Sequence, residues 1–68
     1  MNASKLQTVR KAKGLTQKQL AEASGLSLRT LQHYEQGSKD LNQAAAITVY
    51  GLAVALEVSV EDLLDIDE

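Results

Sequence analysis

Hydrophobic residues recur along the chain at intervals of three and four positions, the spacing of helices with one buried face. Near the N-terminus, Leu6 and Val9 follow this spacing, and Gly14 ends the segment. In the next segment, Thr16 is followed three residues later by Gln19, which is the capping-box signature of a helix start. Two consecutive helices are therefore predicted before residue 25.

A glycine turn separates the second segment from a third. Gly25 adopts a left-handed backbone conformation without the penalty of a Cβ atom. Ser27 is a favoured N-cap residue, and the helix that it begins directs Leu31 and Tyr34 inward and stops before Gly37. This spacing predicts a third helix close behind the second.

The C-terminal half predicts two further helices. Asp40 and Asn42 are candidate caps for a helix through the apolar segment that follows, although its β-branched stretch AITVYG would also suit a strand. Ser59 and Asp62 then mark the start of a short last helix. The predicted fold is all-α, a compact five-helix structure formed by a single domain over residues 1–68, with helices at residues 4–13, 17–24, 28–36, 43–56 and 60–65.

Composition narrows the functional classes. The chain has no cysteine and one histidine. It therefore cannot form disulfides, use thiolate chemistry or bind a metal through a cluster of cysteine and histidine ligands. Its longest uncharged apolar run, residues 44–56, has 13 residues where a membrane span needs about 20. We therefore expect a cytoplasmic protein that is not an enzyme and needs neither a metal nor a cofactor.

The net charge of −2 hides an asymmetry along the chain. All seven basic residues precede residue 40, where only Glu22 and Glu35 oppose them, so this part carries +5. The remainder carries −7. Because charges are screened beyond about 8 Å at physiological salt, a polyanion at the N-terminal part senses mainly the local charge. Binding to double-stranded DNA is thus compatible with the acidic total, although solvated helix faces are the alternative.

Three positions in residues 17–36 match the mechanics of a helix-turn-helix. Counted from Gln17, the small Ala21 is fifth, Gly25 is ninth and Leu31 is fifteenth. A small residue lets two helices cross closely, glycine makes the turn, and an apolar residue locks the second helix to the core. Such a unit places its second helix in the DNA major groove.

Two segments extend this pattern over nearly the whole chain. LQTVRKAKGLTQKQLAEASGLSLRTLQHYEQG and LAVALEVSVEDLL together resemble the Cro-like, lambda-repressor-like helix-turn-helix domain of phage and bacterial regulators. GLTQKQLA and YEQG are the most specific parts of the resemblance. It implies a domain that binds a pseudo-palindromic operator, usually as a two-fold dimer.

The resemblance also assigns roles on the DNA-facing side. Gln17 matches a position that hydrogen-bonds a phosphate, and Lys39 matches a loop position near the DNA backbone. Four residues match positions that face base edges: Leu28, Arg29, Thr30 and His33. Arg29 is expected to bind guanine through two hydrogen bonds, and the alternative is a solvated arginine in a salt link. His33 is expected to contact a base or a phosphate, and the alternative is an idle surface histidine.

Leu28 departs from the polar residue that is common at its position. Its side chain is suited to a thymine methyl group, or to a protein partner in place of DNA. Arg10 and Glu35 match a partly buried salt bridge, so their expected role is structural.

The predicted fourth helix is apolar on two sides. Its core face would contain Ala45, Val49, Leu52, Ala53 and Leu56. A second stripe on the opposite side contains Ile47, Tyr50, Gly51 and Val54. Because a helix that is apolar all round is buried on both sides, this stripe predicts a homodimer interface, unless the core-facing arc is simply wider.

Two functions remain open. The first is a sequence-specific transcriptional regulator, a repressor that occupies operator DNA. The second is a protein-binding module, for instance an antitoxin that uses Leu28 or the second stripe against a toxin. A neighbouring gene for a small toxin would favour the second.

Overall fold

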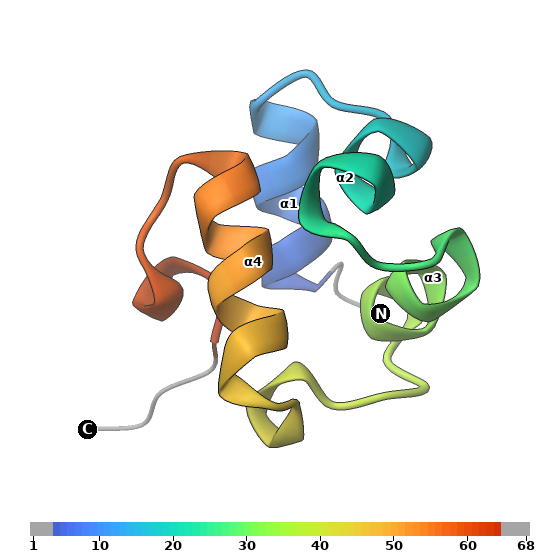
Figure 1. Cartoon of the computed structure of the whole chain (residues 1–68), viewed down its shortest axis with the longest axis vertical. Helices are drawn as coiled ribbons and strands as arrows, with labels where there is room; N and C mark the ends of the chain where they lie inside the picture. The colour runs from blue at the N-terminus through green and yellow to red at the C-terminus, as the bar shows by residue number, and fades with distance from the viewer. Residues whose placement is uncertain (1–3, 65–68) are drawn as a thin grey trace.

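Four α-helices and two 3-10 helices make up residues 4–64, the part of the chain that the structure, a computed structural model, describes (Figure 1). The elements in chain order are α1 (Lys5–Ala12), α2 (Gln17–Ser24), α3 (Leu28–Gln36), η1 (Leu41–Gln43), α4 (Ala46–Leu56) and η2 (Val60–Asp62). No strand occurs in these residues, which confirms the all-helical prediction.

Local capping interactions set the ends of α2 and α3. The Thr16 hydroxyl accepts a hydrogen bond from the Gln19 backbone N–H at 3.1 Å, and the Gln19 side-chain oxygen accepts one from the Thr16 N–H at 2.9 Å. Gly25 ends α2 at a φ of 80°. The Ser27 hydroxyl then accepts from the Thr30 N–H at 3.1 Å to begin α3. Both helices have the predicted bounds because their signals are local.

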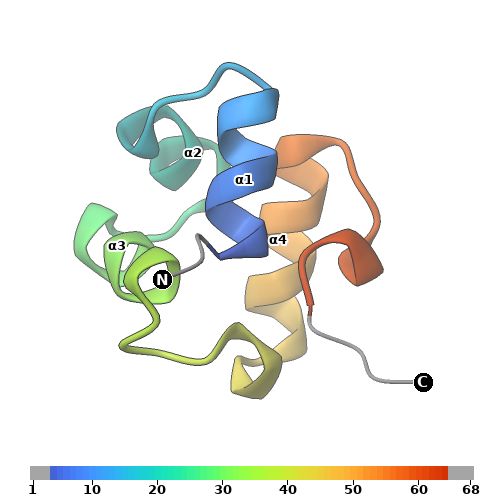
Figure 2. The same ribbon diagram turned by 180° about the vertical axis from the view of Figure 1, so that it is seen from behind.

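Helix α4 lies against α1 and α2 and supplies much of the hydrophobic core (Figures 1 and 2). Leu20, Leu31 and Leu52 come from three different helices, and none of their side-chain surface is exposed. The buried apolar residues are Leu6, Leu20, Ala21, Leu31, Leu41, Val49, Leu52, Ala53, Leu56 and Leu63. Helical spacing of the buried residues in α4 explains why its β-branched segment is helix and not strand.

The start of α4 differs from the prediction. The expected helix over residues 43–56 begins at Ala46, because the backbone is extended at Ala44 and Ala45, where ψ is 157° and 145°. The Asp40 carboxylate caps η1 instead, accepting from the Asn42 N–H at 3.0 Å. This separate turn buries Leu41 in the core. Ala45, predicted to face inward, is exposed at the N-cap of α4.

The predicted fifth helix is a single 3-10 turn. The Asp62 carboxylate accepts hydrogen bonds from the Ser59 backbone N–H at 3.1 Å and the Ser59 hydroxyl at 3.0 Å, so the start of η2 is where the sequence placed it. The turn ends at Asp62 because the chain then directs Leu63 into the core. Residue 65, the predicted end of this helix, lies outside the described residues.

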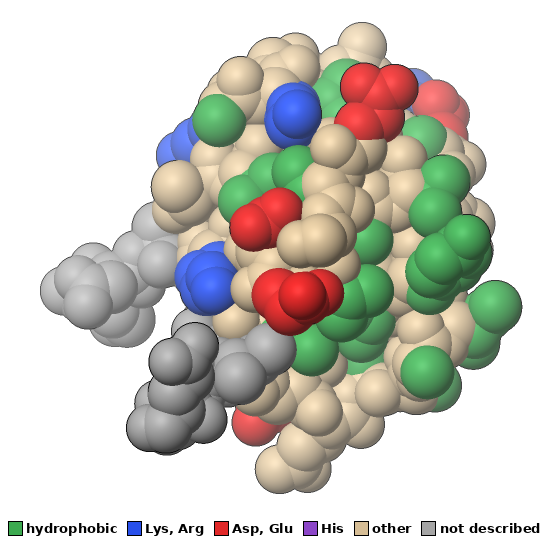
Figure 3. Space-filling view, turned by 90° about the vertical axis from the view of Figure 1, so that its left-hand side faces the viewer, with side chains coloured by type: hydrophobic (Ala, Val, Ile, Leu, Met, Phe, Trp, Pro, Cys, Tyr) green, Lys and Arg blue, Asp and Glu red, His purple; other side chains and the backbone are tan. Residues whose placement is uncertain are grey.

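The outer side of α4 exposes large apolar side chains. Ile47, Tyr50 and Val54 have exposed fractions of 77%, 61% and 57%. In Figure 3, hydrophobic side chains gather along the right-hand edge of the molecule. This edge is the side turned toward the viewer in Figure 1, where α4 lies. Gly51 lies at the border of this surface, where a Cβ atom would be 3.3 Å from the Ser24 carbonyl oxygen. Its lack of a side chain is thus explained by the approach of α2 to α4 within one chain.

Candidate nucleic-acid interface

The turn between α2 and α3 is held by backbone hydrogen bonds to a single carbonyl. The Ala21 carbonyl accepts from the Gly25 N–H at 3.0 Å and from the Leu26 N–H at 3.1 Å. Ala21 is 4% exposed, and its small side chain lets the two helices approach. With Leu31 fully buried on the other helix, the unit has the three mechanical features expected of a helix-turn-helix.

Helix α3 has an inward and an outward face. Leu31 and Glu35, one helical turn apart, are buried. On the other side, Arg29 is exposed and His33 is half-buried, while Leu28, in the first turn of the helix and three residues before Leu31, is 41% exposed. The outward face therefore combines an arginine, which donates hydrogen bonds, with a histidine, which can donate and accept them.

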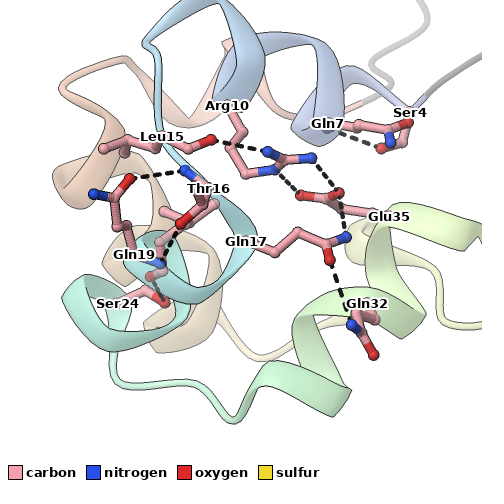
Figure 4. Close-up of polar contacts among 11 residues, drawn as sticks. Ser4, Gln7, Arg10, Leu15, Thr16, Gln17, Gln19, Ser24, Gln32 and Glu35 are labelled. Carbon is pink, nitrogen blue, oxygen red and sulfur yellow. Dashed lines mark hydrogen bonds and ion pairs between the residues drawn. The ribbon is translucent and has the colours of Figure 1, made fainter.

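A buried ion pair fixes the inward face of α3 to α1. The Arg10 guanidinium donates to the two Glu35 carboxylate oxygens at 2.7 and 3.1 Å, from Nε and Nη2 respectively. Its Nη1 donates to the Leu15 carbonyl oxygen at 2.8 Å (Figure 4). This two-point geometry leaves neither charged group of the pair unpaired in the core.

Gln17, the first residue of α2, extends this cluster toward the surface (Figure 4). Its Nε2 donates to Glu35 Oε1 at 3.0 Å, and its Oε1 accepts from Gln32 Nε2 at 3.3 Å. Gln17 is half-buried, and one of its amide hydrogens is left over after these contacts. The structure thus brings Gln17 into direct contact with α3.

The remaining predicted DNA-facing residues lie at the two ends of α3. Thr30 is half-buried, and its hydroxyl oxygen accepts from the Ser27 hydroxyl at 2.9 Å. Lys39 is exposed, and its backbone N–H donates to the His33 carbonyl oxygen at 3.2 Å. This bond holds the Lys39 segment beside the C-terminal end of α3.

Two further polar residues on the outward face were not found from the sequence. Gln32 and Gln36 lie three and seven positions after Arg29, which places them on the same side of α3. Gln32 is half-buried and Gln36 is exposed. Counting three and then seven positions onward from Arg29, the spacing of residues on one side of a helix, would have identified them.

The basic residues differ in what their side chains contact. The Lys5 Nζ donates to the carbonyl oxygens of Leu64 and Glu61 at 2.7 and 3.2 Å, which ties α1 to the segment around η2. Lys18 and Arg29, in α2 and α3, are exposed. Acidic side chains lie on the η2 side of the molecule (Figure 3). Lys5 therefore has a structural role, whereas the helix-turn-helix keeps exposed cations of its own.

Residues 4–64 contain no group of three or more histidine or acidic side chains placed to hold a metal ion. None of the helices in this segment has the length and apolar character required to cross a membrane.

Comparison with known proteins agrees with this geometry. A helix-turn-helix family model matches residues 6–63. The chain is also similar to the restriction-modification controller protein C.AhdI from Aeromonas hydrophila, whose crystal structure superposes with a TM-score of 0.79 at 32% sequence identity. The match covers 88% of this chain and 86% of the controller. No match was found among curated proteins.

Proposed function

The chain belongs to the Cro-like, lambda-repressor-like family of helix-turn-helix proteins, DNA-binding regulators of transcription, and from this premise we propose that it is a repressor. It acts in the cytoplasm as a homodimer on a pseudo-palindromic operator, with one copy of α3 in the major groove of each half-site. Occupation of the operator excludes RNA polymerase from the DNA that it needs.

The outward face of α3 is the observation that carries this proposal. Arg29 lies on it exposed, while Leu31 and Glu35 anchor the opposite face in the core. A recognition helix needs this combination, because base contacts require side chains whose backbone is held in a defined position. Arg29 is the residue to which we assign guanine recognition, by hydrogen bonds to O6 and N7.

Leu28 precedes Arg29 on the same helix and is 41% exposed. An apolar side chain of this size packs against the methyl group of thymine, which no other base carries in the major groove. We therefore expect each half-site to present a thymine beside the guanine that Arg29 contacts. Thr30 and His33 supply further polar contacts from the same face.

Phosphate contacts come from both ends of the unit. Gln17 retains one amide hydrogen after its bonds to Glu35 and Gln32. This N–H can donate a hydrogen bond to a phosphate oxygen. The N-terminal end of α2 adds backbone N–H groups at the same place. Lys39, exposed beyond α3, supplies a cation for the neighbouring phosphates. These contacts set the position of the protein on the duplex and read no sequence.

The exposed apolar surface of α4 supports a homodimer. Ile47, Tyr50 and Val54 are more than half exposed and lie on one side of the helix. Beside Tyr50 is a groove of about 390 Å³, whose lining includes Val60 and Leu64. Because a two-fold contact uses the same surface on both subunits, the projecting side chains of one copy can enter the groove of the other. Gly51 lies at the edge of this interface.

Fluorescence anisotropy with labelled DNA from upstream of the chain's own gene tests the proposal. Binding should weaken as salt rises, with a log–log slope of about −0.9 for each phosphate contacted. Absence of binding at low salt, or an affinity that salt does not change, would contradict it.

A second candidate function is supported by the same exposed apolar residues. Leu28 and the α4 side chains Ile47, Tyr50 and Val54 also suit a protein partner, such as a toxin that this chain neutralises. A neighbouring gene for a small toxin, and a stable complex of the two purified proteins, would support this function. DNA binding through Arg29 leaves the α4 surface to another contact, but a toxin on Ile47, Tyr50 and Val54 would take the place of the second copy of this chain.

A further inference from the structure

The Gln32 side chain lies between the N-terminal end of α2 and the outward face of α3 (Figure 4). Its Nε2 donates to Gln17 Oε1 at 3.3 Å, and its amide oxygen points away from this contact (Figure 4). Gln17 in turn donates to Glu35 Oε1 at 3.0 Å. The orientation of the Gln32 amide is therefore connected to the buried pair of Glu35 and Arg10.

The hydrogen-bonding capacity that Gln32 retains is specific. A glutamine side chain has two N–H donors and one carbonyl oxygen, and the bond to Gln17 uses one donor. One N–H and the oxygen remain. Adenine offers the complementary pair in the major groove, because its N7 accepts a hydrogen bond and its N6 amino group donates one.

We propose that Gln32 reads an adenine in each half-site, and that Gln17 is a positioning residue that fixes the Gln32 amide for this contact. The inference rests on the proposed function, because it requires α3 to lie in the major groove. It adds a base-reading residue to those predicted from the sequence, and it gives Gln17 a second role besides phosphate contact.

The place of Gln32 on α3 agrees with this role. It lies three residues after Arg29 and four before Gln36, so the three side chains share one side of the helix. Gln32 is only half exposed, which limits the conformations that its amide must lose on binding DNA. The adenine should be close to the guanine read by Arg29, on the side of the half-site nearer to the α2 N-terminus.

The test selects preferred sites from a pool of DNA duplexes randomised over about 20 base pairs, roughly two half-sites one helical turn apart. The selected site is then varied at each position, and its affinity is measured for the wild type and for Gln32→Ala, Gln17→Ala and Arg29→Ala. Gln43→Ala, an exposed glutamine in η1, is the matched control. Circular dichroism confirms that each variant is folded.

The wild type should prefer adenine at one position of each half-site by about tenfold. Gln32→Ala should abolish this preference, Gln17→Ala should reduce it at the same position, and Arg29→Ala and Gln43→Ala should leave it in place. If Gln32→Ala retains every base preference while Arg29→Ala loses one, this inference is wrong and the proposed function stands. If the wild type selects no sequence, both are wrong.

Discussion

Arg10 and Glu35 are 25 residues apart in the sequence and form an ion pair joined by two hydrogen bonds, of 2.7 and 3.1 Å. Their side chains are only 9% and 1% exposed. The pair connects α1 to the inward face of α3, while Gln17 joins it from α2. Three helices therefore meet at one charged cluster. The proposed DNA-binding face is the outward face of α3, which points away from this cluster.

Removing one member of this pair should be costly. Arg10→Met leaves the Glu35 carboxylate buried without its cation, and we expect a loss of about 3–5 kcal/mol in the free energy of unfolding. The double variant Arg10→Met/Glu35→Leu should recover much of this loss, because no unpaired charge remains. Urea unfolding followed by circular dichroism measures both. Lys11→Met, an exposed change on the same helix, is the control, and an Arg10→Met variant as stable as this control would contradict the prediction.

Glu57 is a position where the protein can be stabilised. It ends α4 with a φ of 60°, a left-handed conformation that is unfavourable for most residues other than glycine and asparagine. A carboxylate at a helix C-terminus is also repelled by the helix dipole. Glu57→Gly should therefore raise the free energy of unfolding by about 0.5–1 kcal/mol, after the greater unfolded-state entropy of glycine is subtracted. Glu57→Gln, which removes the charge and keeps the strain, should gain less; an equal gain would assign the effect to charge alone.

Lys39 should affect affinity without affecting sequence preference. If its ammonium group contacts a phosphate, Lys39→Ala weakens binding to all duplexes by a similar factor and reduces the magnitude of the log–log salt slope by about 0.9. Anisotropy titrations at several salt concentrations measure both quantities. An unchanged slope would remove Lys39 from the interface.

The dimer is tested at the centre of the exposed α4 surface. Tyr50 is 61% exposed, so Tyr50→Asp should leave the fold intact while placing two carboxylates in an apolar contact. Light scattering should give twice the mass of one chain for the wild type and a single chain for the variant. Gln43→Asp, an exposed change in η1, is the matched control. A wild-type monomer, or a Tyr50→Asp dimer, would exclude this interface.

The parts of the fold that follow from local chemistry were predictable from the sequence. Thr16, Gln19, Gly25 and Ser27 act on their own neighbours, so the bounds of α2 and α3 agree with the prediction. The start of α4 depends on the burial of Leu41, which comes from outside that helix. No local signal contains such information.

The last helix fails as a prediction for the same reason. Leu63 enters the core and Lys5 binds the carbonyl oxygens of Glu61 and Leu64 from the opposite end of the chain, so the segment forms one turn instead of a helix. The bond between Gln17 and Gln32 is also set by the packing of α2 on α3. The roles in DNA binding assigned from the resemblance remain predictions.

The specificity ratio measures the central claim most directly. It is the Kd for a non-specific duplex divided by the Kd for the selected operator, determined at physiological salt for the wild type and for Arg29→Ala. The wild-type ratio should be at least about 10³, and Arg29→Ala should lower it by about 5- to 150-fold while the non-specific Kd changes far less. A wild-type ratio near one, or a ratio that Arg29→Ala leaves unchanged, would contradict recognition of DNA sequence by the outward face of α3.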